Sequence, residues 1–175
     1  MIRISLLLAS LLFAPCCANA AYTVPATGSI EVAFSPNDGA TALVVHTIDQ
    51  AKSSILGQAY SFTSAPIARA LAEAHQRGGD VRVILDKSQK TERYSIAVYL
   101  RNHGIPTWID SRHAIAHNKV MVIDGATVIT GSFNFTKAAE EKNAENVIVL
   151  HDNPRLAAIY TQNWLAHAAH SVREF

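Results

Sequence analysis

The feature that most constrains the fold of this chain is an alternation between two hydrophobic periods along residues 30–85. Apolar side chains recur at every second position in residues 30–34, which predicts a strand, and at helical spacing in residues 43–51, which predicts a helix. The alternation continues with a strand at 54–62, a helix at 67–74 and a buried strand at 81–85. Strands that alternate with helices are typical of an α/β domain, in which helices pack on a sheet.

The second half of the chain adds antiparallel pairing to this pattern. Residues 119–123 and 127–129 are strand-like and flank Asp124-Gly125, a dipeptide that favours a hairpin. A further strand is predicted at residues 145–150 and a final helix at residues 154–170. We therefore expect an α/β fold in which a mixed β-sheet is sandwiched between helices.

The first twenty residues have the pattern of a secretory signal peptide. Arg3 precedes an apolar run at residues 6–14 that is too short to span a bilayer, and Ala18-Asn19-Ala20 is a small-x-small cleavage site. We assign residues 1–20 to a signal peptide and residues 21–175 to a single domain, and we expect an exported protein, periplasmic or secreted. Both cysteines lie in the segment that cleavage removes, so no disulfide is expected.

The charge balance excludes a strongly basic binding protein. The chain has 15 basic and 14 acidic side chains and a formal net charge of +1, so a site for a polyanion must be a local concentration of charge. One loose basic stretch contains Lys87, Lys90, Arg93 and Arg101. This stretch is either a solvated face or a track for a nucleic-acid backbone. We expect no stable membrane association, because no other apolar segment is long enough to cross a bilayer.

Residues 117–134 carry the most informative group of polar side chains. His117 and Lys119 are two residues apart at the start of a predicted strand, so their side chains project from the same face. The valines at 120 and 122 face the other way, into the core. The hairpin then returns the chain antiparallel, which brings Ser132 and Asn134 to the space that His117 and Lys119 face.

This combination of side chains suits a phosphate ester. Lys119 supplies a compact cation, and Ser132 and Asn134 supply neutral donors for negative charge on phosphoryl oxygens. Gly131 allows close approach of the backbone. Neutral His117 keeps a lone pair on one ring nitrogen and can attack phosphorus as a nucleophile.

Two acidic residues accompany this group. Glu145, at the start of the next predicted strand, is the best candidate for an acceptor that orients the ring of His117. Asp124 lies at the hairpin end of its strand, remote from His117. We therefore interpret Asp124 as a structural turn residue with a buried polar partner.

The spacing of these residues resembles the signature of the phospholipase D superfamily: His-x-Lys, four residues, Asp, six residues, Gly-Ser-x-Asn. The match has no exception, at His117, Lys119, Asp124, Gly131, Ser132 and Asn134. A short exported chain with one motif and with Ala144-Glu145-Asn146 downstream is similar to the small bacterial endonuclease branch. The resemblance implies that residues 21–175 form a phospholipase D-like catalytic domain.

The resemblance also implies a two-step reaction that needs two histidines. His117 would form a phosphohistidine, and a second histidine would protonate the leaving oxygen and then activate water. Most members carry two motifs, but no other histidine here has the required sequence around it; the nearest is His75-Gln76-Arg77. We therefore expect a homodimer whose active site is shared at the two-fold interface, with no cofactor.

Three functions are compatible with the motif. The leading prediction is a metal-independent phosphodiesterase, namely a nonspecific endonuclease. Its expected substrate is DNA, and the sequence leaves open whether RNA is a second substrate. The alternative is a phospholipase D or phosphatidyl transferase. A lipid substrate would favour an apolar rim around the site entrance or a membrane-binding helix, and the sequence shows neither. A phosphate-binding module without catalysis is disfavoured, because binding alone needs no histidine at position 117.

No metal ligands are expected. His113 and His117 are four residues apart, as zinc ligands on a helix can be, but they lie in what is predicted to be a loop, and no third ligand has suitable spacing. His167 and His170 fall on the final helix and are expected to be solvated. Trp108 and Trp164 are expected in the core rather than as platforms on which bases stack.

Overall fold

A computed structural model describes residues 21–174 of the chain. The predicted signal peptide, residues 1–20, lies outside the described residues. Eight strands form one sheet in the order β1-β7-β6-β5-β2-β3-β4-β8. Their bounds are β1 Ile30–Ser35, β2 Ser54–Ala59, β3 Asp80–Asp86, β4 Thr107–Asp110, β5 Lys119–Ile123, β6 Thr127–Gly131, β7 Glu145–Leu150 and β8 Val172–Arg173.

The sheet is mixed, as predicted. β2, β3 and β4 run parallel to one another, and the other neighbouring pairs are antiparallel. The parallel strands come from the alternating first half of the chain, because a parallel neighbour needs a crossover connection. The antiparallel ladder β5-β6-β7 comes from the second half, where the connections are short.

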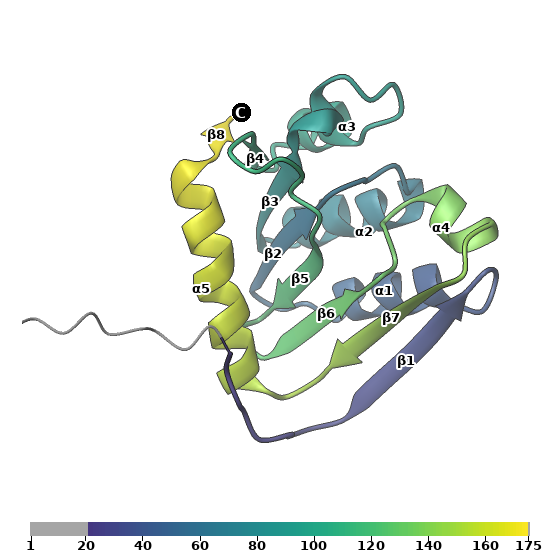
Figure 1. The fold of residues 1–175 in the computed structure, drawn as a ribbon, viewed down its shortest axis with the longest axis vertical. Helices are drawn as coiled ribbons and strands as arrows, with labels where there is room; N and C mark the ends of the chain where they lie inside the picture. Colours follow the sequence, from purple (N-terminus) through teal and green to yellow (C-terminus); the bar gives the residue numbers. More distant parts are fainter. Residues whose placement is uncertain (1–20, 175) are drawn as a thin grey trace, which may run out of the picture.

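Helices cover both faces of this sheet (Figure 1). Their bounds are α1 Ala40–Asp49, α2 Ala65–Gln76, α3 Ala97–Asn102, α4 Lys137–Glu141 and α5 Pro154–His170, with a 3-10 turn η1 at Lys87–Lys90. α1 and α2 lie behind the sheet in this view, and α5 lies along the opposite face. The predicted fold class, a mixed sheet between helices, is therefore confirmed.

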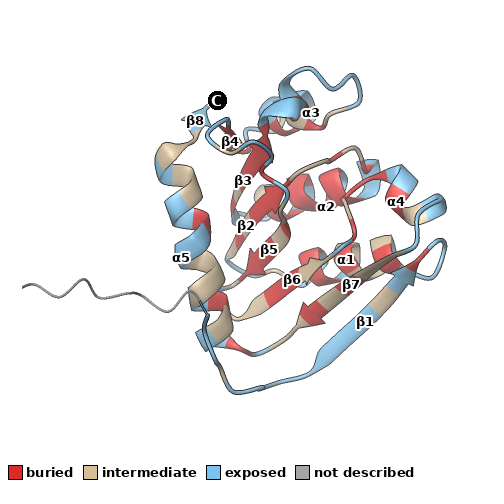
Figure 2. Ribbon diagram, in the orientation of Figure 1, coloured by how far each residue is buried: buried red, intermediate tan, exposed pale blue. Residues whose placement is uncertain are grey.

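The two faces bury cores of different size (Figure 2). The larger core joins α1 and α2 to the sheet and includes Ile48, Leu71 and Met121. The smaller core lies beneath α5 and includes Val122 and Ala157. Burial of a side chain of this size contributes about 1.5–3 kcal/mol, so the larger core dominates the stability of the fold.

The predicted orientation of the valines in β5 is confirmed, and the structure shows which of the two cores they enter. The valines at 120 and 122 do face away from Lys119, but they face α5 and the smaller core. Met121, on the same face as Lys119, points into the larger core. Lys119 therefore lies at the edge of the main core rather than on an open face.

The indole of Trp164 ties α5 to the centre of the sheet. Its side chain is 2% exposed, and its Nε1 donates a hydrogen bond of 2.8 Å to the carbonyl oxygen of Gly57 in β2. The ring of Trp108 in β4 packs edge-on against it at 5.7 Å. The prediction that both tryptophans belong to the core is confirmed for Trp164, whereas Trp108 is only half-buried.

Candidate active site at the end of strand β5

The chain brings three separate segments together at the start of β5. β6 pairs with β5 from Ile123 back to Met121 and ends at Gly131, and the chain then continues past the start of β5. Phe135 forms a bridge with Phe62, which follows β2 on the far side of β5. Since β5 lies between β6 and β2, the segment before Phe135 must cross this end of β5. This crossing places Asn134 next to the His117–Lys119 end of the strand.

Lys119 is a buried cation with spare hydrogen-bonding capacity. Its residue is 7% exposed, and its Nζ donates a 2.8 Å hydrogen bond to the carbonyl oxygen of His117. Burial lowers the pKa of Lys119 below its ordinary value, and the nearby carboxylate of Glu145 partly offsets this effect. An ammonium has three N–H donors. Within residues 21–174 one of them is used, which leaves two for a bound anion.

The imidazole of His117 is exposed beside this cation. Its ring packs against the ring of Tyr60, with the two centroids 4.7 Å apart. The Nζ of Lys119 lies 5.3 Å from the centre of the Tyr60 ring. Tyr60 thus separates and positions the two functional groups. Sequence reasoning missed Tyr60, because its contact with His117 depends on the pairing of β2 with β5.

The predicted hydrogen bond between Glu145 and His117 is not formed within residues 21–174. The carboxylate of Glu145 instead accepts a bond of 3.3 Å from the side-chain amide of Asn143. β6 ends at Gly131, which pairs with Val147 of β7, so Glu145 lies two residues beyond the end of β6, and its carboxylate raises the pKa of Lys119. Glu145 therefore acts here on the charge of Lys119, and its role in orienting His117 stays a prediction.

Gly131 is required by its own backbone. Its φ is 148°, and a Cβ at this position would lie 2.3 Å from the carbonyl oxygen of Asn146 in β7. The close approach that was predicted for Gly131 is therefore made to the neighbouring strand. It lets the backbone N–H groups of Ser132 and Phe133 both donate to that carbonyl at 3.1 Å.

Ser132 and Asn134 both retain polar groups for a ligand. The hydroxyl oxygen of Ser132 accepts from the backbone N–H and the side-chain amide of Asn146, at 3.0 and 3.3 Å, which leaves its own O–H to donate. The Oδ1 of Asn134 is buried without a hydrogen-bond partner within residues 21–174. This oxygen is an acceptor and does not bind an anionic oxygen, so the group that Asn134 offers to a phosphate is its side-chain NH₂, which donates.

A buried carboxylate holds the loop that carries His117. Asp86, at the end of β3, accepts a 2.8 Å hydrogen bond from the backbone N–H of Ala116 and a 2.9 Å bond from that of Ser88. Desolvation opposes its ionisation, but these bonds outweigh it and lower the pKa of Asp86. Lys87 reinforces the loop by donating to the carbonyl oxygen of His113 at 3.0 Å. The sequence analysis had placed Lys87 in a basic stretch and had given Asp86 no role.

Asp124 lies at the opposite end of β5 from Lys119. Its carboxylate accepts hydrogen bonds of 2.8–2.9 Å from the backbone N–H groups of Lys52, Ser53 and Ser54 and from the Ser53 hydroxyl. Burial raises its pKa, but the four bonds outweigh burial and lower it. These contacts fasten the β5–β6 turn to the segment before β2 and leave Asp124 away from the other motif side chains.

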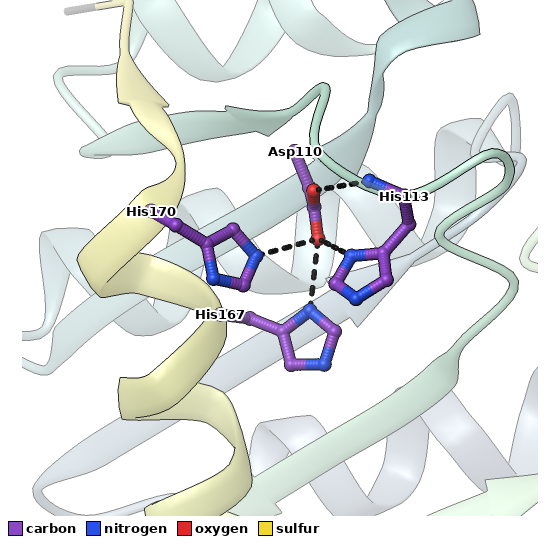
Figure 3. A group of neighbouring side chains, drawn as sticks. All are labelled: Asp110, His113, His167 and His170. Carbon is purple, nitrogen blue, oxygen red and sulfur yellow. Dashed lines mark hydrogen bonds and ion pairs between the residues drawn. The ribbon is translucent and has the colours of Figure 1, made fainter.

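A second polar group lies where β4 ends and α5 ends (Figure 3). The Oδ2 of Asp110 lies 2.9 Å from His113 Nδ1, 2.8 Å from His167 Nδ1 and 3.3 Å from His170 Nε2. The expectation that His167 and His170 are solvated was wrong: their side chains are 15% and 19% exposed. We call Asp110, His113, His167 and His170 the Asp–His cluster.

The sequence analysis ruled out metal ligands by pairing His113 with His117. The structure instead pairs His113 with Asp110 and with two histidines from the final helix. Within residues 21–174 this is the one group of three or more His, Cys, Asp or Glu side chains arranged so that it can hold a metal ion. The basis for expecting no metal ligand is therefore removed.

The chain resembles known proteins over most of its length. Residues 44–167 match the family described as "Cardiolipin synthase, PLD-like domain". A protein named phospholipase D from Rickettsia felis is 45% identical over 140 residues, which cover 80% of this chain and 70% of the relative. A mitochondrial cardiolipin hydrolase from Xenopus laevis is 34% identical over 142 residues, 75% of this chain and 67% of the relative.

Solved structures give the same result for the fold. Nuc from Salmonella typhimurium, described as a phospholipase D family member, superposes with a TM-score of 0.80 at 44% identity, over 83% of this chain and 97% of that chain. NucT from Helicobacter pylori, at 23% identity, shares the fold with a TM-score of 0.74, over 83% of this chain and 99% of that chain.

The site and the fold define a phosphodiester hydrolase. With the family match over residues 44–167 and relatives above 40% identity, the chain belongs to the phospholipase D superfamily.

Proposed function

We propose that this protein is an exported endonuclease that hydrolyses phosphodiester bonds in DNA, and also in RNA, without a metal ion in the chemical step. The observation that carries the proposal is the buried ammonium of Lys119 beneath the exposed ring of His117. A buried cation with two unused donors is costly unless it meets an anion. The phosphodiester of a nucleic acid is such an anion.

The chemistry proceeds in two steps. A ring nitrogen of His117 attacks phosphorus, the bond from phosphorus to the leaving oxygen breaks, and that oxygen takes a proton from a second histidine. Water then attacks the phosphohistidine, gives its proton to the second histidine, and releases a phosphate monoester and free His117. Lys119, Ser132 and Asn134 hold the non-bridging oxygens, where negative charge builds up.

The second histidine comes from a second copy of the chain. One chain carries one motif, and His117 and Ser132 are both exposed where the start of β5 and the end of β6 form one edge of the site. A two-fold axis through this edge would bring two His117 rings to one phosphate, with two Lys119 and two Asn134 around it. The proposed partner is therefore an identical subunit whose side chains complete the site.

A lipid substrate is the second candidate. The relatives from Rickettsia felis and Xenopus laevis are named phospholipase D and mitochondrial cardiolipin hydrolase. Ile115, two residues before His117, is 55% exposed, and an apolar side chain at this place is suited to a lipid. Within residues 21–174, no helix combines the length and the apolar character needed to cross a membrane.

Nucleic acid remains the first choice for two reasons. The single motif with Glu145 resembles the small exported endonuclease branch, and a nonspecific nuclease is safe for the cell that makes it only outside the cytoplasm. The signal peptide proposed for residues 1–20 fits that location. Of the basic stretch, Lys87 and Lys90 are engaged by His113 and Glu174, so they stiffen the surface near the site as well as charging it.

The test compares substrates under one condition. The purified protein is incubated in EDTA with supercoiled plasmid, with single-stranded RNA, and with vesicles of phosphatidylcholine or cardiolipin. We expect plasmid cleavage by the native chain and its loss in His117→Ala, with His151→Ala as the matched control, since His151 pairs with Glu31 away from the motif. Lipid hydrolysis without plasmid cleavage would establish the second candidate instead.

A further inference from the structure

The Asp–His cluster is built from three parts of the chain. Asp110 ends β4, His113 lies in the loop that leads to His117, and His167 and His170 lie three residues apart on α5. Side chains three apart on a helix share a face, so both helical imidazoles point at the end of β4. Figure 3 shows the three rings converging on one carboxylate oxygen.

The arrangement is crowded for hydrogen bonding alone. Asp110 is fully buried, and its Oδ2 faces three ring nitrogens. The imidazole centroids are 4.8–5.3 Å apart, so three rings that must each point a proton at one oxygen also crowd one another. The mechanism proposed for His117 uses none of these groups.

The distances fit a cation at the centre. The four candidate ligand atoms all lie within 4.8 Å of one another. In a tetrahedral zinc site with bonds of about 2.0–2.1 Å, ligand atoms are about 3.3–3.4 Å apart. The three distances from Oδ2, 2.8, 2.9 and 3.3 Å, are close to that value, and the distances among the ring nitrogens are at most 4.8 Å.

The surroundings prepare the carboxylate to act as a ligand. The other oxygen of Asp110, Oδ1, accepts a 3.0 Å hydrogen bond from the backbone N–H of Arg112, which fixes the carboxylate so that Oδ2 faces the histidines. Such support of a ligand by neighbouring groups is typical of metal sites. His113 is the most exposed member, at 43% for its side chain, and offers a path of entry.

We propose that Asp110, His113, His167 and His170 bind one divalent transition-metal ion, with zinc as the best fit. Three imidazoles and one carboxylate are a ligand set that zinc prefers and that magnesium and calcium do not. With four protein ligands the site is closed, which is the mark of a structural rather than a catalytic zinc.

The bound ion would fasten the end of the chain to the loop of the active site. α5 ends at His170, and β8 then pairs with Trp108 and Ile109 of β4. His113 stands four residues before His117 in the loop that Asp86 also holds. Zinc would therefore join the last helix, β4 and the first part of this loop at one point.

Metal binding is measured directly, so the result does not depend on hydrolysis. The purified, tag-free protein is freed of metal by chelation and titrated with zinc by calorimetry and with cobalt(II) by absorption spectroscopy. We expect one zinc per chain, an intense visible band typical of tetrahedral cobalt, and a rise in Tm of about 10 °C when free zinc is a hundredfold above Kd.

Variants assign the site. His170→Gln and His167→Gln should each weaken zinc binding at least about tenfold and lose the tetrahedral cobalt band. His103→Gln is the matched control, because His103 bonds to the carbonyl oxygen of Tyr99 instead, and it should bind zinc as the native chain does. If Asp110→Asn does not fold, the two histidine variants still decide.

Two outcomes would overturn the proposal: no stoichiometric zinc in the native chain, or equal zinc affinity in His170→Gln and His103→Gln. Failure of the proposed nuclease activity would leave these measurements unaffected. A native chain that cleaves plasmid but binds no zinc would overturn the metal site and leave the proposed function standing.

Discussion

His117 and His113 lie four residues apart in one loop, yet their surroundings are opposite. The ring of His117 is exposed beside a buried ammonium, and no hydrogen bond within residues 21–174 engages its nitrogens. His113 points its Nδ1 at a buried carboxylate that it shares with two other imidazoles. The imidazole of His117 lies beside a cation, so its lone pair is available for attack on phosphorus. The imidazole of His113 meets two other imidazoles at a carboxylate, an arrangement that suits a metal ion or a structural contact. Residue type alone therefore does not tell these roles apart.

The largest expected effect separates the two histidine groups by activity. His117→Ala should lower phosphodiester hydrolysis at least about a thousandfold, because it removes the nucleophile, with little change in Tm, because the ring is exposed. During turnover the native chain should carry acid-labile, base-stable phosphate on His117. His167→Ala should do the reverse, lowering Tm while retaining most hydrolysis per folded molecule. Substantial hydrolysis by His117→Ala would contradict the assignment of the nucleophile.

The two ends of β5 provide a second contrast. Asp124→Ala should destabilise the fold by about 1–3 kcal/mol, since it leaves three backbone N–H groups of residues 52–54 without their acceptor, and should not change hydrolysis by the folded fraction. The pKa of Asp124 is lowered in the fold, so its contribution is complete above the unfolded value of about 3.9 and is lost as the pH falls through the lowered folded pKa. Thermal unfolding of both proteins between pH 7 and pH 3 should show the difference narrowing at the acidic end.

Sequence patterns predicted what depends on neighbours in the chain. The bounds of β5, β7 and α5 agree with their hydrophobic periods, and the Asp124-Gly125 hairpin sets the register of the motif. The short helix α4 was not predicted, because five residues are too few to show a helical period.

What the sequence did not reveal depends on long-range packing. Tyr60 reaches His117 because β2 is the neighbour of β5, and no local pattern reports that pairing. The Asp–His cluster joins residues 110 and 113 to residues 167 and 170. These two pairs of residues meet only because α5 packs beside β4, and that packing cannot be seen in the sequence. Glu145 shows the converse: it follows the motif closely in the sequence, yet its carboxylate accepts from Asn143 and not from His117.

Glu145→Gln sharpens the question of what that carboxylate does. If it only balances the charge of Lys119, hydrolysis should fall about tenfold, with the loss in the step that binds phosphate. If it also orients His117 in the assembled enzyme, the loss should appear in kcat at saturating substrate. Steady-state kinetics with a dinucleotide ester distinguishes the two, and an unchanged rate would remove Glu145 from the site.

The shared site predicts how mixed subunits behave. Native and His117→Ala chains are unfolded together, refolded and allowed to pair at random. If both His117 rings serve one phosphate, activity follows the square of the native fraction, so an equal mixture keeps about a quarter of the activity. Independent chains would keep about a half. A linear dependence, or a fully active monomer in sedimentation, would rule out the composite site.

The smallest expected effect comes from removing metal, and it tests whether the two histidine groups are independent. Chelation should lower Tm, because zinc stabilises only the folded Asp–His cluster. The initial rate of hydrolysis below the new Tm should change less than about twofold, since Lys119 and Asn134 already supply the charge stabilisation that a catalytic metal would provide. The control is His170→Gln, whose rate and Tm should both be indifferent to chelator. A rate that falls to zero in EDTA and returns with zinc in the native chain, but not in His170→Gln, would show that the cluster takes part in catalysis. The assignment of catalysis to His117 and of a purely structural role to the Asp–His cluster would then be wrong.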